Sequence, residues 1–140
     1  MRLPLVTATL AVLSGLAMCP ALATAGADEA APTPALIEHA EWAQWGDLKS
    51  LRVYPTAVGR AEAGQLRNRA VGEAAWRQVL AAAPEADIPG MHEQFRCHWQ
   101  LAEFAHPGKS SWNLEPWRPQ VDPATMIETG CNPGGTQEPF

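Results

Sequence analysis

The chain has 140 residues, 46% of them hydrophobic, with 15 acidic and 10 basic side chains. Its length fits one small domain with a single modest core, so no second domain is expected. The net negative charge disfavours a nucleic-acid partner.

Residues 1–27 have the pattern of a secretory signal peptide. Arg2 gives a positive start, residues 3–16 are nearly all apolar, and small residues follow up to Ala27. The apolar run is too short for a membrane-spanning helix, and no later segment approaches the ~20 apolar residues of a span. We expect cleavage between Ala23 and Ala27 and a mature chain that is secreted or otherwise extracytoplasmic.

Two alternatives to this cleavage stay open. The leader could remain as an anchor, or Cys19 could be lipidated, although the preceding Met18 is bulky where such sites usually carry a small residue. After the leader, residues 28–35 are rich in Ala, Pro and acid and predict a disordered tether. Residues 36–135 then form the single predicted domain, and residues 136–140 a flexible tail.

The domain opens with a predicted β-hairpin. Residues 36–45 and 48–54 favour two strands, joined by a short turn at Gly46 and Asp47. Pro55 lacks the backbone donor of a strand interior and ends the second strand.

The main helix is predicted over residues 72–83. Before it, residues 56–70 favour no clear element, because Gly59 and Gly64 interrupt any long helix. The apolar residues at helical spacing are Trp76, Val79, Leu80 and Ala83. Pro84 ends this helix, and Trp76 is expected to anchor it on the sheet.

The window from residue 49 to residue 77 is locally basic. Its charged residues are Lys49, Arg52, Arg60, Arg67, Arg69 and Arg77 against Glu62 and Glu73. The window predicts either a basic patch or a solvated face with scattered ion pairs of little energetic value, and the second interpretation is favoured.

Residues 91–101 alternate between two kinds of side chain. The odd positions hold Met91, Phe95, Cys97, Trp99 and Leu101, interrupted only by Glu93, and the even positions hold His92, Gln94, Arg96, His98 and Gln100. A period of two over eleven residues predicts a half-buried antiparallel strand.

The remaining elements are an extended segment and a short helix. Pro116 and Pro119 keep residues 112–119 extended, so this segment is expected on the surface, held by Trp112, Leu114 and Trp117. Asp122 is a good N-cap with Pro123 at the first helical position and Gly130 after the last turn, which predicts a helix over 122–129 with Met126 and Ile127 facing inward.

The fold class that follows is α+β. It combines a small antiparallel sheet of three or more strands, one main helix packed on it, a short C-terminal helix and one disulfide. The mature chain retains only Cys97 and Cys131, which in an exported protein most simply form that disulfide. The alternative is a catalytic or metal-binding Cys97, but its neighbour His98 would point to the opposite face of a strand.

Three motifs in the second half of the chain carry a resemblance. They are M-H-E-Q-F-R-C-H (91–98), W-N-L-E-P-W-R-P (112–119) and C-N-P-G-G (131–135), and L-R-V-Y-P-T (51–56) and the Trp76 helix agree with them. With them the chain resembles domain of unknown function 2599, a family of small exported bacterial proteins. The resemblance covers roughly residues 36–135 and implies no activity or catalytic residues.

The candidate site combines the even face of residues 91–101 with the proline-rich segment. Gln94, Arg96 and His98 would meet Glu115 and Arg118, with Trp112 and Trp117 as aromatic walls for a ligand. A histidine, a carboxylate and two guanidiniums could serve acid and base catalysis on an anionic or sugar-containing substrate. The alternative is that Glu115 and Arg118 simply pair and the tryptophans cover a small core.

Two functions follow from these residues. The favoured one is a non-enzymatic module that binds an unknown protein or envelope component, because surface tryptophan and arginine often anchor interfaces. The alternative is a small secreted hydrolase, a phosphodiesterase or nuclease-like toxin, with His98 as acid or base and an arginine stabilising an anion. No cofactor is expected, and the histidines lack the spacing of a metal site.

Overall fold

A computed structural model describes residues 31–135 of the chain. The predicted signal peptide, the first residues of the predicted tether and the predicted tail lie outside the described residues. Within residues 31–135 no helix is both long and apolar enough to cross a membrane.

The predicted hairpin is confirmed. Strands β1 (Ile37–Trp45) and β2 (Leu48–Pro55) pair antiparallel, and Trp45 lies opposite Leu48 across the turn. Gly46 in that turn has a φ of +57°, a left-handed conformation that glycine adopts at little steric cost.

The third strand comes from the proline-rich segment. Strand β3 (Trp112–Leu114) pairs antiparallel with β2, so that Trp112 lies opposite Val53 and Leu114 opposite Leu51. All four side chains are fully buried. Trp112 and Leu114 therefore hold the segment, as expected, but they do so within a strand paired with β2, which was not predicted from the sequence. The sheet has the order β1-β2-β3.

Residues 91–101 are helical, so the predicted strand was wrong. Helix α3 runs over Met91–Ala105, and its buried side chains recur at helical spacing: Met91, Gln94, Phe95, Cys97, His98, Trp99 and Ala102. The polar residues Gln94 and His98 occupy core positions in this stripe. The apolar residues alone therefore do not show the helical spacing. The segment is rich in good helix formers, and a helix places its aromatic rings on one side.

The predicted main helix is confirmed as α2 (Arg69–Ala82), followed by a short 3-10 helix, η1 (Pro84–Ala86). The unassigned region before it holds α1 (Ala57–Ala63), capped by Thr56, whose side chain accepts from the Gly59 amide at 2.9 Å. Gly64 ends α1 after seven residues.

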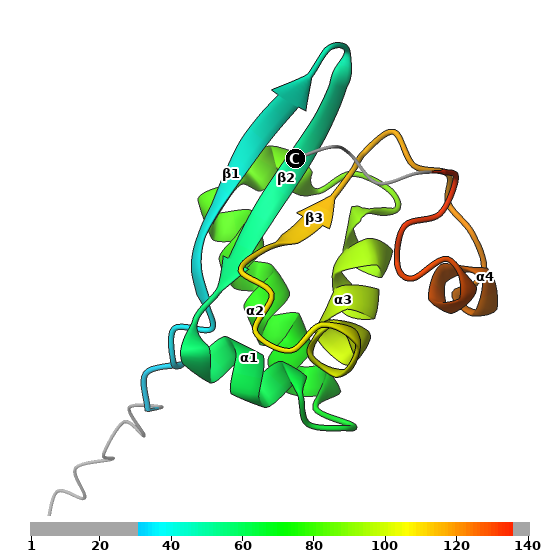
Figure 1. Cartoon of the computed structure of the whole chain (residues 1–140). Coiled ribbons are helices and arrows are strands. Elements are labelled where there is room, and N and C mark those ends of the chain that lie inside the picture. The colour runs from blue at the N-terminus through cyan, green and yellow to red at the C-terminus, as the bar shows by residue number, and fades with distance from the viewer. Residues whose placement is uncertain (1–30, 136–140) are drawn as a thin grey trace, which may run out of the picture. The chain divides into compact units, whose positions relative to one another are not determined.

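The core lies between the sheet and helices α2 and α3, as Figure 1 shows. Phe95 is at the centre of an aromatic cluster, with ring centroids 5.3 Å from Trp76 and 6.1 Å from both Trp99 and Trp112. A buried aromatic side chain removes roughly 150–250 Å² from water. These four rings therefore join the two helices to β3.

A second, smaller cluster attaches the last helix. Helix α4 (Pro123–Glu128) is capped by Asp122, whose carboxylate accepts from the backbone amides of Ala124 and Thr125. Met126 is buried as predicted, but Ile127 is 55% exposed, so its predicted inward position was wrong. The Cys97–Cys131 disulfide is confirmed, with Cα atoms 5.5 Å apart, and Met126 packs against it.

Candidate functional site

The predicted site residues are only partly brought together. Gln94 and His98 lie one turn apart on the buried side of α3, with exposed fractions of 1% and 6%. Glu115 and Arg118 follow β3, where Glu115 hydrogen-bonds to Gln94 and Arg118 pairs with Glu115. Arg96 lies apart from them, half-exposed, with its Nε 3.9 Å from a carboxylate oxygen of Glu73. The helix separates Arg96 from Gln94 and His98, which a strand would have kept on one face.

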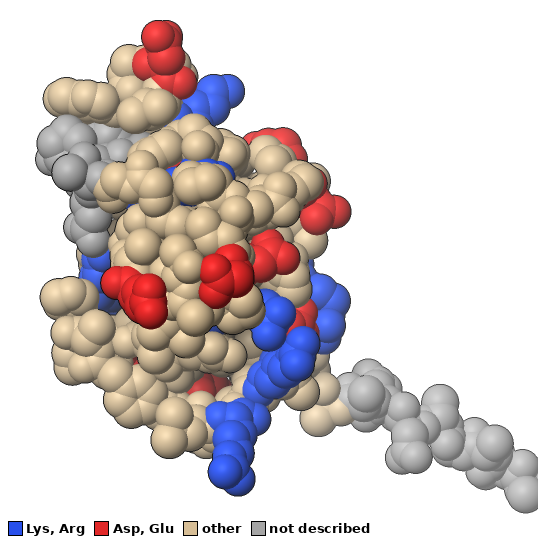
Figure 2. Space-filling model, turned by 90° about the vertical axis from the view of Figure 1, so that its right-hand side faces the viewer, with Lys and Arg blue, Asp and Glu red and all other residues tan. Residues whose placement is uncertain are grey.

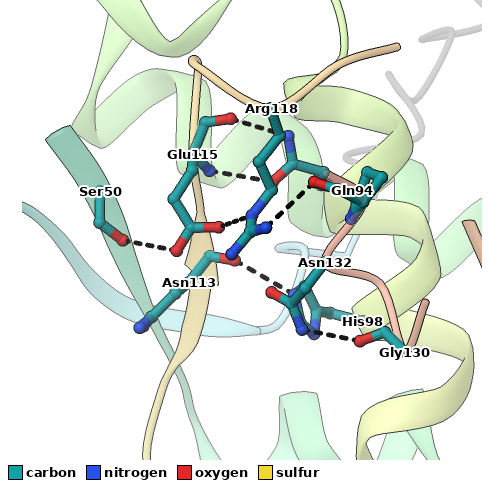
Figure 3. Close-up of polar contacts among 9 residues, drawn as sticks. Ser50, Gln94, His98, Asn113, Glu115, Arg118, Gly130 and Asn132 are labelled. Carbon is teal, nitrogen blue, oxygen red and sulfur yellow. Dashed lines mark hydrogen bonds and ion pairs between the residues drawn. The ribbon is translucent and has the colours of Figure 1, made fainter. Parts of the chain in front are cut away.

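Glu115 is the centre of a buried polar lattice, drawn in Figure 3. Its carboxylate accepts from Ser50 Oγ at 3.2 Å and from Arg118 Nε. Its backbone and the Gln94 side-chain amide exchange two hydrogen bonds of 2.9 Å each. Arg118 also donates through Nη1 to the Pro133 carbonyl at 3.0 Å. We call this set of five residues the Glu115 lattice.

The lattice joins parts of the chain that are far apart in sequence. It connects β2, α3, the turn after β3 and the loop after Cys131. The charged side chains of Glu115 and Arg118 are only 2% and 0% exposed and pair with each other. This geometry favours a structural role, because neither charge is presented to a molecule arriving from solvent.

The two predicted aromatic walls have different environments. Trp112 is fully buried in the core. Trp117 is half-buried, and the Arg118 guanidinium carbon lies 4.5 Å from its ring centroid. A ligand that approached the end of the proline-rich segment would therefore meet Trp117, whereas Trp112 contacts other core residues.

His98 is held in one tautomer by the backbone of β3. Its Nε2 lies 3.1 Å from the Asn113 carbonyl oxygen, which can only accept, so Nε2 carries the hydrogen and Nδ1 the free electron pair. Burial is the main cause that lowers the pKa of His98 to about 4. The nearby charges of Lys109 and Arg118 act in the same direction, and the hydrogen bond to Asn113 acts in the opposite one. His98 is therefore a neutral side chain near pH 7.

A groove opens beside His98, between the C-terminal half of α3 and the chain around α4. Its volume is about 530 Å³, and it extends from His98, Phe104 and Lys109 to Ile127 and Asn132. We call it the α3–α4 groove. Lys109 and His106 line it, and none of its described lining residues is Asp or Glu.

The groove combines apolar walls with a polar end. Phe104 and Ile127 are 56% and 55% exposed, so each presents apolar surface to solvent in the groove. Asn132, on the lining with His98, donates from its side chain to the Gly130 carbonyl at 2.8 Å, as Figure 3 shows. Among residues 31–135 no group of three His, Cys, Asp or Glu residues is arranged to hold a metal ion.

The motifs that suggested a family contact one another in the fold. The loop after Cys131 contacts the proline-rich segment at Gly134, where a Cβ atom would lie 2.4 Å from Pro119 Cδ. Gly134 has a φ of +86°, so a side chain there would be excluded by both contact and conformation. Arg118 and Gln94 add the hydrogen bonds of the Glu115 lattice. The three motifs are thus parts of one packed unit.

Comparison with known proteins identifies that unit. A family model described as "Protein of unknown function (DUF2599)" matches residues 37–134. The chain belongs to this DUF2599 family. The resemblance inferred from the motifs is therefore confirmed.

The relatives of this DUF2599 protein include mycobacterial proteins. It is 58% identical over 108 residues to uncharacterized proteins of Mycobacterium bovis and Mycobacterium tuberculosis, covering 77% of this chain and 72% of each relative. An uncharacterized protein of Mycobacterium leprae is 46% identical over 98 residues, or 70% of this chain and 79% of the relative. No solved structure matches the chain.

Several residues of the site escaped sequence reasoning, among them Ser50, Asn113, Lys109 and Asn132. Ser50 and Asn113 contribute through the lattice and through a backbone carbonyl, and neither type stands out in a strand. Lys109 and Asn132 reach the groove from loops. The position of Asn132 within C-N-P-G-G, directly after the disulfide-bonded Cys131, was the one sequence signal that could have indicated a site residue.

Proposed function

We propose that this protein is an exported binding module whose ligand docks in the α3–α4 groove. The supporting observation is the groove's combination of two half-exposed apolar side chains, Phe104 and Ile127, with a polar end at His98 and a cation at Lys109. Ligand sites commonly combine apolar walls with a few polar groups that fix orientation. The ligand that fits has an apolar part and an acceptor or anionic group, presented by a protein or an envelope component.

Export is supported by the sequence and by the Cys97–Cys131 disulfide. The leader over residues 1–27 has a positive start and an apolar centre, and disulfides persist mainly in oxidising compartments. Intact-mass measurement of the protein recovered from a bacterial host should give a mature N-terminus between residues 24 and 28. A chain that retains its N-terminal residues in the cytoplasm would contradict export.

A small secreted hydrolase is the second candidate, because His98 lines a groove beside Lys109. Its support is weaker. With a pKa near 4, His98 is a poor base at neutral pH and cannot act there as a protonated acid. Glu115 and Arg118 are paired and buried in the lattice, and Arg96 lies on another side of α3.

Site-specific cross-linking tests the binding site. A photoreactive phenylalanine analogue replaces Phe104 in one variant and Val58 in a control variant, since Val58 is an apolar residue of α1 that is 49% exposed and absent from the groove lining. Both proteins are irradiated with an envelope fraction. We expect a saturable adduct at position 104. Excess unlabelled protein should compete with its formation, and Ile127→Ala should reduce its yield.

Two outcomes would contradict the proposal. Equal labelling from positions 58 and 104 would mean that the groove has no specific partner. Turnover of a phosphodiester or nucleic-acid substrate that disappears in a folded His98→Gln variant would favour the hydrolase instead.

A further inference from the structure

A second hollow lies on the other side of the C-terminal half of α3. It is about 330 Å³ in volume, between the turn that joins α1 to α2 and the outer surface of α3, and Leu66, Arg67, Arg69, Trp99 and Gln100 line it. A small adjoining hollow shares Arg69 and Trp99 and adds Arg96 and Glu73. We call the two together the arginine groove.

The charge of the arginine groove is positive. Arg67 and Arg69 are exposed, and the only acidic side chain among its described lining residues is Glu73. Glu73 is already engaged, with its carboxylate oxygens 3.0 Å from His92 Nε2 and 3.9 Å from Arg96 Nε. In the view of Figure 2, Lys and Arg side chains gather in a line toward the lower part of the molecule, with Asp and Glu side chains above them.

The arginine groove matches neither interpretation of the basic window in the sequence, because those used only residues 49–77. The structure spreads the window, since Lys49 lies on the hairpin and Arg60 donates to the Lys109 carbonyl. The arginine groove instead combines Arg67 and Arg69 with Arg96 from a distant part of the chain. The basic surface is thus a product of the tertiary fold.

The first turn of α2 opens onto this groove without a side-chain cap. Asn68, at the N-cap, makes no capping hydrogen bond, and its side-chain NH2 group donates to the Glu62 carboxylate. The first turn contains no acidic residue. Free backbone amides and the positive end of a 14-residue helix attract an anion at this position.

Trp99 places a donor that is unpaired among residues 31–135 beside the arginine groove. Its side chain is only 4% exposed and lines both hollows, and its Nε1–H has no acceptor among the described residues. The indole lies against Gly72 in the first turn of α2, where a Cβ atom would be 3.0 Å from Nε1. A buried donor without an acceptor costs stability, so it is normally paired.

We propose that the arginine groove binds a phosphate group. Arg67 and Arg69 supply charge-assisted hydrogen bonds, Trp99 supplies a neutral donor, and the first turn of α2 supplies backbone amides. Donors of these three kinds suit an oxyanion with several acceptor oxygens. The phosphate is either free or part of a lipid headgroup, and Leu66, 79% exposed beside the arginines, would contact the apolar region of a lipid surface.

This proposal is independent of the α3–α4 groove, since the two surfaces share only Leu101 among their lining residues. The test is ¹H–¹⁵N NMR of the mature protein, in which six tryptophans give six indole signals. The Trp99 signal is assigned by its absence in Trp99→Phe. Inorganic phosphate is titrated against chloride at equal ionic strength, and vesicles of phosphatidylcholine with and without phosphatidylglycerol are added in a separate arm.

A saturable shift of the Trp99 indole signal with phosphate, but not with chloride, is the expected result for a free phosphate. Binding only to vesicles that contain phosphatidylglycerol would identify a lipid phosphate as the source. Arg67→Ala and Arg69→Ala should each weaken either response about tenfold, the scale of one lost charge-assisted hydrogen bond. Arg77 is an exposed arginine of α2 outside the groove, so Arg77→Ala should leave the response unchanged.

The proposal would be overturned if neither phosphate nor anionic vesicles moved the Trp99 signal. It would also be overturned if Arg77→Ala weakened binding as much as Arg67→Ala and Arg69→Ala, because the effect would then be one of overall charge.

Discussion

Removing one charge from the Glu115 lattice should destabilise the fold strongly. Glu115→Gln keeps the shape of the side chain but leaves Arg118 buried without a counter-charge, at an exposed side-chain fraction of 0%. Breaking one partner of a buried ion pair costs about 3 to 5 kcal/mol. This is a large part of the roughly 5 to 15 kcal/mol that stabilises a whole domain.

The assay is urea unfolding followed by tryptophan fluorescence, with the disulfide intact. The midpoint should fall in Glu115→Gln with little change in the denaturant slope. Glu128→Gln is the matched control, because Glu128 is exposed at the end of α4 and its loss should change stability by less than about 0.5 kcal/mol.

A double-mutant cycle separates the pair from its surroundings. Arg118→Met alone should also destabilise the protein, whereas Glu115→Gln with Arg118→Met should cost clearly less than the sum of the two single changes. If Glu115→Gln were as stable as Glu128→Gln, or if the two changes were additive, the assigned role of the lattice would be refuted.

Two further predictions concern the disulfide and His98. Cys97→Ser with Cys131→Ser should lower the free energy of unfolding by about 3 to 4 kcal/mol on the chain-entropy model, and denaturing thiol titration of the wild-type protein should find neither thiol free. His98 should make stability fall between pH 6.5 and about 4, because the unfolded side chain gains a proton at its ordinary pKa while the folded one gains it only near 4. The loss reaches about 3 kcal/mol below pH 4, and urea unfolding across this range should show a flatter profile for His98→Gln than for wild type.

The secondary-structure elements that are marked by local sequence signals were predictable. The hairpin follows from two strand-favouring runs around Gly46, and α4 follows from Asp122 and Pro123 at its start. Helix α2 begins three residues earlier than predicted, because no capping side chain marks its start at Arg69. Each of these features depends on neighbours within a few positions, so a single sequence contains the necessary information.

Helix α3 was not predictable from apolar periodicity. Its residues satisfy a period of two by the coincidence that Cys97 faces α4 while Phe95 and Trp99 face the main core. Gln94 and His98 are polar yet buried, because Glu115 and the Asn113 carbonyl provide their partners from another part of the chain. A polar residue becomes a core residue only when such a partner exists.

The sequence by itself determined the fold class, the hairpin, helices α2 and α4 and the pairing of Cys97 with Cys131, because these depend on local propensity or on the cysteine count. Only the tertiary structure decided that Glu115 and Arg118 close into a buried lattice, that His98 lines a groove with Lys109, and that the arginine groove exists. These arrangements join residues distant in the chain, and their energetics depend on burial and on partners supplied from elsewhere.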